Sequence, residues 1–191
     1  MVRKEKVLVA GASGYLGRYA VREFKRRGFW VRVLARNPEK LKVKGPFMEP
    51  AIDHLHDDLF VGEITRQETL RGLCDDIDIV FSSIGITRQR DGVSFMDVDY
   101  RGNKKLLSAA LNSGVSKFVF VSVFKADQIT HLAEAREMFV NDLKQSGLSY
   151  AIVRPTGYFS DMSEYLKMAR SGRVLVLGTG RNKINPIHGR D

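Results

Sequence analysis

Residues 6–17 read KVLVAGASGYLG, and this stretch decides the fold. Its apolar run, Val7 to Ala10, is typical of a buried β-strand, and glycines follow at positions 11, 14 and 17. An amphipathic segment from Tyr15 to Arg27 comes next, with Leu16, Tyr19, Ala20 and Phe24 on one helical face. A helix that starts in a glycine turn presents unpaired N–H groups and the positive end of its dipole, which bind nucleotide phosphates. The stretch therefore predicts a strand, a phosphate-binding turn and a helix, although the spacing is G-x-x-G-x-x-G rather than G-x-G-x-x-G.

The next apolar run, Trp30 to Ala35, predicts a second strand, and Arg36 follows it. In a dinucleotide-binding unit, an acidic residue about 20 positions past the glycines binds the ribose hydroxyls of NAD. A guanidinium at this corner instead suits a phosphate, which a carboxylate would repel. Arg36, with Lys40 nearby, therefore favours NADP over NAD; the alternative is a solvated basic turn, because the chain has many.

Length and composition indicate one soluble globular domain. The chain has 191 residues, 43% hydrophobic and 28% charged, with a formal net charge of +9. The basic residues are dispersed among acidic ones, so we expect no specific nucleic-acid partner. No apolar run is long enough to span a bilayer and the N-terminus shows no signal-type core, so we expect a cytoplasmic protein. The single cysteine, Cys74, is interpreted as a buried thiol.

Strands and helices alternate along the rest of the chain. Further strands are predicted at 59–61, 77–83, 117–122 and 149–153, and helices at 67–73, 95–112 and 129–144. Short connections between them predict an α/β fold of the Rossmann type, with a doubly wound parallel sheet and right-handed crossovers. We expect a single domain over 1–191, with a cofactor core over 1–157. Residues 158–191 are expected to begin a minimal substrate-covering lobe.

Five stretches carry a resemblance to a known family. They are GASGYLG at 11–17, DIVF at 78–81 before Gly85, VDYRGN at 98–103, FVFVS at 118–122 and SGLSYAIVRP at 146–155. Together they resemble the atypical short-chain dehydrogenase/reductases, and among them the NmrA-like NAD(P)-binding proteins, from Val7 to Asp191. In this family Asn103 usually braces its helix against a strand. The segments 173–178 and 184–191 resemble family segments that lead into a further helix, so we expect a truncated product, a fragment or a compact member.

The resemblance implies a set of cofactor-binding residues at the carboxyl ends of the strands. They are Gly11, Ser13, Gly14, Tyr15, Leu16 and Gly17 at the pyrophosphate, Arg36 at the adenosine phosphate, Glu63 and Ile64 beside the adenine, Ser83, Ile84 and Gly85 on the ribose side, Ser122 near the nicotinamide, and Pro155, Thr156, Gly157 and Tyr158 at the nicotinamide end. At position 63 glutamate replaces the aspartate usual in the family.

One departure from the family pattern bears on catalysis. Active short-chain dehydrogenases carry Tyr-x-x-x-Lys on the helix after the fifth strand, where the lysine lowers the pKa of the tyrosine. The corresponding positions here are Leu132 and Arg136. The catalytic residues are therefore unknown from the sequence, and the candidates are Ser122, His131 and Tyr158.

Other patterns lead to no site. His54 and His56 have the side chains of metal ligands but lie in a connection away from the expected cofactor, so we expect a surface loop and no metal. No serine is paired with a histidine and an acid as a hydrolase requires. The sequence leaves two functions open: an NADP-dependent oxidoreductase or isomerase acting on a small carbonyl or conjugated substrate, and a non-catalytic NADP(H)-binding sensor, regulator or assembly factor with a protein partner.

Overall fold

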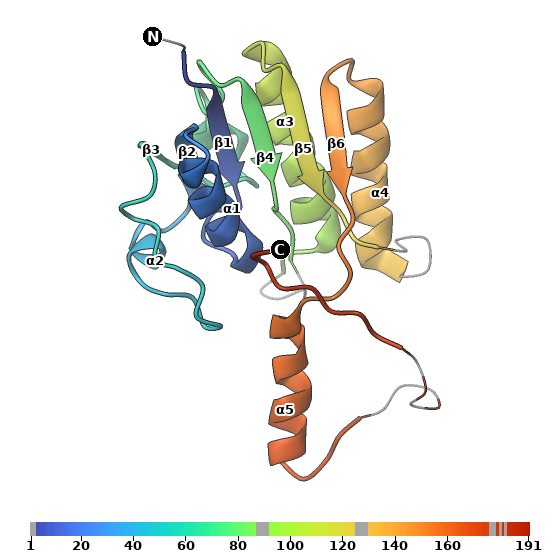
Figure 1. Cartoon of the computed structure of the whole chain (residues 1–191). Coiled ribbons are helices and arrows are strands. Elements are labelled where there is room, and N and C mark those ends of the chain that lie inside the picture. Colours follow the sequence, from blue (N-terminus) through green and yellow to red (C-terminus); the bar gives the residue numbers. More distant parts are fainter. Residues whose placement is uncertain (1–2, 87–91, 125–129, 176–178, 180, 182) are drawn as a thin grey trace.

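The fold is built on one parallel sheet of six strands (Figure 1). We describe residues 3–86, 92–124, 130–175, 179, 181 and 183–191 of a computed structural model. The strands are β1 (Lys6–Ala10), β2 (Trp30–Ala35), β3 (Asp58–Val61), β4 (Ile79–Ser82), β5 (Lys117–Val121) and β6 (Ser149–Val153). Their order is β3-β2-β1-β4-β5-β6, and all neighbouring pairs are parallel. The Rossmann-type sheet predicted from the sequence is thereby confirmed.

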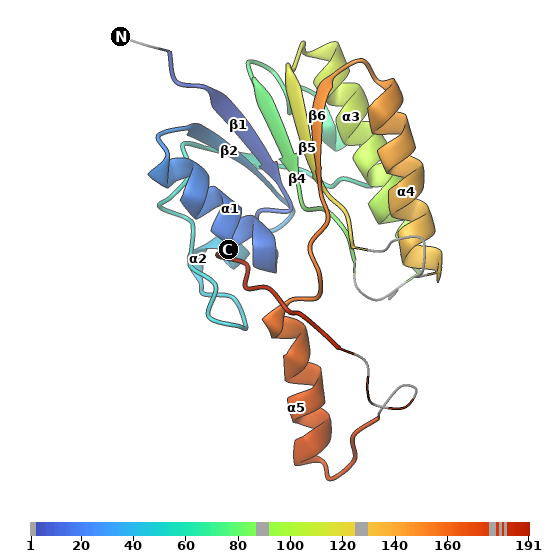
Figure 2. The ribbon, with the colours of Figure 1, turned by 45° about the vertical axis from the view of Figure 1, so that its right-hand side comes forward.

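Helices cover the sheet on both faces (Figure 2). The helices α1 (Tyr15–Arg26) and α2 (Glu39–Lys42) lie on one face, and α3 (Asn103–Asn112) and α4 (Thr130–Gln145) lie on the other. Alternate residues of β1 enter the two cores: Val7 and Val9 pack with α1, and Leu8 and Ala10 pack with α3 and α4. Burial on both faces explains why the inner strands β1, β4 and β5 are nearly continuous apolar runs.

The strand order places a crevice at the end of β1. From β1 the chain crosses to β2 on one side, and β4 pairs with β1 on the other side. The connections after β1 and β4 therefore separate at the carboxyl edge of the sheet, and open α/β sheets bind ligands at such a point. The glycine turn after Ala10 and the loop after Ser82 both lie there.

Before β6, three helical segments differ from the prediction. The predicted helix 95–112 is divided into a π-helical segment, η2 (Met96–Gly102), and α3. The side chain of Asn103 donates to the Asp99 carbonyl at 2.9 Å and so competes for an acceptor of the helical ladder. The predicted helix 67–73 is only a 3₁₀ turn, η1 (Gln67–Leu70), before Gly72 at a φ of 79°. The short helix α2 was not predicted, although it buries Leu41.

The predicted bracing role of Asn103 is confirmed. Its side chain is fully buried, accepts the Ser82 hydroxyl at 2.6 Å and donates to the Ile84 carbonyl at 3.3 Å. Because Ser82 ends β4 and Ile84 follows it, these bonds hold the loop after β4 against the start of α3. The sequence prediction of a buried Cys74 is also confirmed, and burial raises the pKa of this thiol to about 12.

The chain after β6 extends away from the sheet and then returns. The 3₁₀ turn η4 (Phe159–Asp161) leads into α5 (Met162–Arg170), which projects below the sheet (Figures 1 and 2). The last residues come back to the glycine turn: Ile187 forms a bridge with Tyr158, and the Gly189 N–H donates to the Tyr15 hydroxyl at 3.1 Å. Helix α5 was not predicted and buries none of its residues. Among the described residues, no helix has the length and apolar character required to cross a membrane.

Candidate cofactor-binding site

The glycine turn joins β1 to α1, and its backbone lies in close contact with the start of the helix. Gly11 has a φ of 87°, which favours glycine, and its carbonyl accepts the Gly14 N–H at 3.0 Å. A Cβ on Gly17 would collide with that same Gly11 carbonyl, so the start of α1 packs directly on the turn. No side chain caps α1 within the described chain and its first turn has no acidic residue. The N–H groups at this helix start are therefore available to a diphosphate, which the dipole also favours.

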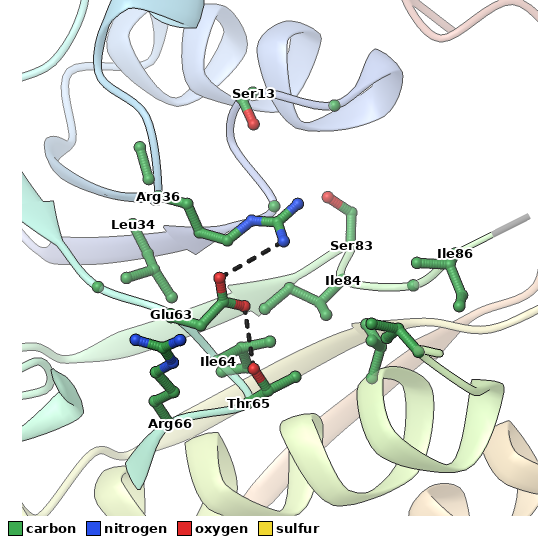
Figure 3. Close-up of a pocket in the computed structure, with 17 residues that line it drawn as sticks. Ser13, Leu34, Arg36, Glu63, Ile64, Thr65, Arg66, Ser83, Ile84 and Ile86 are labelled. Carbon is green, nitrogen blue, oxygen red and sulfur yellow. Dashed lines mark hydrogen bonds and ion pairs between the residues drawn. The ribbon is translucent and has the colours of Figure 1, made fainter. Parts of the chain in front are cut away.

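A first cavity of about 550 Å³ opens beside this turn (Figure 3). It is lined by the turn itself, the end of β2, the loop after β3 and the loop after β4. Its residues are Gly11, Ser13, Gly14, Leu34, Ala35, Arg36, Gly62, Glu63, Ile64, Thr65, Arg66, Ser83, Ile84, Gly85, Ile86, Val93 and Val98. Apolar walls with a few polar groups are typical of a site for a nucleoside.

Arg36 and Glu63 both line this cavity and form an ion pair with each other (Figure 3). The Arg36 Nη1 lies 3.4 Å from the Glu63 Oε2, and 70% of the Arg36 side chain is exposed. The Thr65 hydroxyl donates to the other Glu63 oxygen at 3.2 Å, and the Glu63 N–H donates to Thr69 at 2.9 Å. The carboxylate is therefore fixed by its loop, while the guanidinium is free to turn toward a phosphate.

A second cavity of about 1090 Å³ continues from the first. Gly14, Ser83, Gly85 and Ile86 line both, so the two cavities meet over the glycine turn and the loop after β4. Its other residues are Tyr15, Leu16, Gly17, Pro46, Phe47, Val121, Ser122, Val123, Leu132, Arg136, Pro155, Thr156, Gly157, Tyr158, Ser160, Asp161, Ser163, Glu164 and Lys167. An extended dinucleotide can thus pass from one cavity to the other across the start of α1.

An ion pair lies at the inner wall of the second cavity. The Arg136 Nε donates to the Asp99 Oδ1 at 2.8 Å, and Arg136 Nη1 donates to the Ser122 carbonyl at 3.3 Å. Asp99 is completely buried and also accepts the Ile86 N–H at 3.1 Å. Burial raises the pKa of the Asp99 carboxyl, and the adjacent Arg136 guanidinium opposes that shift. A buried carboxylate with these partners fixes the guanidinium in place.

Ser122 lies between this pair and a second one. Its hydroxyl donates to Glu137 at 3.3 Å, and Arg154 at the end of β6 donates to both Glu137 oxygens at 2.5 and 2.9 Å. The Arg154 guanidinium holds the pKa of Glu137 below its ordinary value. A carboxylate kept ionised in this way orients Ser122 but is a poor proton acceptor.

Among the catalytic candidates, Tyr158 has the same phenolic hydroxyl as the missing catalytic tyrosine. Burial raises its pKa to about 12, and its ring centroid lies 5.3 Å from that of Tyr15. The Tyr-x-x-x-Lys pair works by the opposite shift, so Tyr158 is not activated as that tyrosine is. Leu132 lines the cavity and has no proton to give, and the side chain of His131 lies outside the described residues.

All seventeen predicted cofactor residues line one of the two cavities. Sequence reasoning missed Thr65 and Arg66, which follow Glu63 on the same loop and could have been included for that reason. It also missed Phe47 and the α5 side chains, for which no motif gave a signal. His54 and His56 lie elsewhere: His54 Nδ1 contacts Asp53 at 3.2 Å and His56 Nδ1 contacts the Ile52 carbonyl at 2.9 Å. In the described part of the chain, no cluster of three potential metal ligands is present.

Comparison with known proteins gives the family. Residues 11–179 match the model of a family described as NAD(P)H-binding. The chain therefore belongs to the NAD(P)H-binding family of the atypical short-chain dehydrogenase/reductases.

The names of two curated relatives describe different functions. The chain is 30% identical over 190 residues to divinyl chlorophyllide a 8-vinyl-reductase of Cucumis sativus, with 92% of this chain and 44% of the relative covered. It is 30% identical over 161 residues to the photosystem II assembly factor Ycf39 of Cyanophora paradoxa, with 82% and 46% covered. The chain thus spans about half the length of the curated relatives it matches.

Solved structures share the fold. A nucleoside-diphosphate-sugar epimerase from Staphylococcus aureus superposes with a TM-score of 0.73 at 22% identity, covering 97% of this chain and 62% of the epimerase. The NADPH-dependent quinone oxidoreductase QOR2 from Escherichia coli, in complex with NADPH, superposes with a TM-score of 0.65 at 20% identity, covering 86% and 53%.

Proposed function

We propose that the protein is an NADP(H)-dependent oxidoreductase that reduces a carbonyl or conjugated substrate. The observation that carries this proposal is the pair of cavities that meet over the uncapped start of α1. The diphosphate would bind the N–H groups there, with the adenosine in the first cavity and the nicotinamide in the second. The tight glycine turn fits a diphosphate, because Gly17 lets the start of α1 pack directly on the Gly11 carbonyl and so keeps the helix N–H groups at the turn.

Arg36 supports the preference for NADP(H). Its guanidinium is exposed in the first cavity, and its Glu63 partner is itself held by Thr65. A 2′-phosphate can therefore displace the carboxylate as the partner of Arg36, and the ordered donors of a guanidinium suit it. Glu63 then lies beside the ribose and adenine, where it can accept hydrogen bonds.

The second cavity supports the chemistry. When bound, NADPH supplies a hydride. The side chains that would face the substrate are Ser122, Arg136 and Tyr158, of which Arg136 is cationic. The reductase and oxidoreductase named among the relatives and solved structures are consistent with reduction, but the substrate of this chain stays a proposal.

A second candidate is a non-catalytic NADP(H)-binding regulator or assembly factor with a protein partner. The observation that favours it is the missing acid: Leu132 replaces the tyrosine and the pKa of Tyr158 is raised to about 12. The relative named as an assembly factor fits this alternative. The cytoplasmic location expected from the sequence remains a proposal.

The two cofactors should be titrated against the wild type, Arg36→Ala and a control, Arg71→Ala, which removes an exposed arginine outside both cavities. We expect NADPH to bind at least about tenfold more tightly than NADH, and only Arg36→Ala to remove this difference, since one charged hydrogen bond contributes about 1.5–3 kcal/mol. Equal affinities in the wild type would refute the NADP(H) preference. NADPH oxidation with a carbonyl panel then separates the enzyme from the regulator, because the regulator would bind without turnover.

A further inference from the structure

Arg136 stands where the family has the lysine of its catalytic pair, but the structure gives it a different environment. Helix α4 brings Leu132 and Arg136 to the second cavity, one turn apart. Without the tyrosine, the charge of Arg136 has no hydroxyl at position 132 to activate. The role of this cation has to be derived from its own contacts.

The guanidinium is held on two sides. Nε donates to the buried Asp99 and Nη1 donates to the Ser122 carbonyl, and only 14% of the side chain is exposed. Asp99 cannot turn away, because it also accepts the Ile86 N–H. Gly85 leaves the necessary room, since a Cβ there would collide with Arg136 Nη2. The positive charge of Arg136 is thus fixed beside Gly85, which lines both cavities.

Nη2 is the part of Arg136 available to a ligand. Within the described residues, Nη2 has no hydrogen-bond partner in the protein, and Arg136 lines the second cavity. A preorganised donor that carries a positive charge stabilises an oxygen on which negative charge develops, and it needs no reorganisation to do so. A guanidinium cannot itself release a proton at ordinary pH.

We propose that the acceptor is a conjugated carbonyl compound, an enone or a quinone, and that Arg136 binds the oxygen that becomes negative during its reduction. This inference rests on the proposed oxidoreductase function and names the substrate class of the same site. It makes Arg136 a catalytic residue and Asp99 a positioning residue.

The electron balance explains why conjugation matters. In an enone, a C–H bond forms at the β-carbon with the two electrons of the hydride, and the C=C π pair moves through the conjugated system onto the oxygen. The resulting enolate is bound by Arg136, and water then protonates the α-carbon. A quinone likewise gains two electrons and ends as a hydroquinone after protonation by water. An isolated ketone would instead give a localised alkoxide, a stronger base that requires a proton donor such as the missing tyrosine.

A phenolate probe tests the inference without turnover. We would bind 4-nitrophenol to the protein saturated with NADP⁺ and follow the ionisation of the bound probe by its absorbance. The expected result is a fall in the pKa of the bound phenol by about one unit, which is tenfold in preference for the anion. The neutral pair Asp99→Asn/Arg136→Met should abolish the shift, and Arg136→Lys should reduce it. Lys117→Met removes an exposed charge at the other end of β5 and should leave it unchanged.

The variants also separate this inference from the proposed function. A single Arg136→Met leaves Asp99 buried without its partner and could unfold the protein, so the double variant is used and its folding is checked by thermal unfolding. If NADP⁺ binds but the wild type shows no shift, or the double variant shows the same shift, Arg136 does not have this role. If NADP⁺ does not bind at all, the proposed function itself fails.

Turnover gives an independent readout. With NADPH, we expect the wild type to reduce 2-cyclohexen-1-one or menadione and to reduce cyclohexanone at least about 100-fold more slowly. The double variant should bind NADPH with unchanged affinity but lose about 100-fold in kcat, which is the usual effect of removing an oxyanion donor. Faster reduction of cyclohexanone than of the conjugated substrates would overturn the inference.

Discussion

Replacing Glu63 by glutamine should raise the affinity for NADPH. The Glu63 carboxylate lies 3.4 Å from the Arg36 Nη1, so it occupies the guanidinium and places a negative charge beside the proposed site of the 2′-phosphate. Because most of the Arg36 side chain is exposed, the interaction free energy of the Arg36–Glu63 ion pair is only about 0.2–1 kcal/mol. The repulsion between the carboxylate and a phosphate at roughly 6 Å adds about 1 kcal/mol in water. The two effects together predict a gain of about 1–2 kcal/mol, or roughly five- to thirtyfold in affinity.

The assay is a fluorescence titration of NADPH and NADH at low and high salt. Glu63→Gln should tighten NADPH binding, weaken NADH binding because a neutral amide accepts the ribose hydroxyls less strongly than a carboxylate, and give a smaller NADPH gain at high salt. Glu68→Gln, an exposed change on η1 outside the cavities, is the matched control. Unchanged or weaker NADPH binding by Glu63→Gln would refute the placement of the phosphate beside Arg36.

Three further predictions concern the turn, the second cavity and the core. Gly17→Ala should lower the free energy of unfolding in urea by about 1–3 kcal/mol, because its Cβ meets the Gly11 carbonyl and overpacking has this cost. Glu137→Gln should destabilise the protein in urea at pH 7, and this loss should shrink as the pH falls. The folded-state pKa of Glu137 is lowered, so its stabilisation is present above the unfolded pKa near 4.3 and is lost below it. Native Cys74 should react with a thiol reagent only after denaturation, since burial raises its pKa to about 12.

The parts of the fold that the sequence predicted are those where one local cause dominates. Residues 6–17 contain both the buried apolar strand and the glycines that the tight turn requires, so the strand, the turn and the helix were predicted together. The bracing role of Asn103 followed from family resemblance and is confirmed by its bond to Ser82. The predicted site residues could be placed because the carboxyl ends of parallel strands share one edge of the sheet.

The parts that were missed depend on contacts between distant segments. The π-helical turns of η2 arise where Asn103 takes up the Asp99 carbonyl, and a helical hydrophobic pattern does not reveal that competition. Helix α5 was missed although Met162, Tyr165, Leu166 and Ala169 recur at helical spacing, and none of them is buried in the structure. The ion pair between Asp99 and Arg136 links η2 to α4, and the two residues are 37 positions apart in the sequence.

The most direct test of the account is a crystal structure of the protein with NADP⁺. We predict the diphosphate within hydrogen-bond distance of the backbone N–H groups at the start of α1, the 2′-phosphate on Arg36 and the nicotinamide in the second cavity beside Ser122. A dinucleotide bound elsewhere on the protein, or bound in the two cavities in the opposite direction, would contradict it.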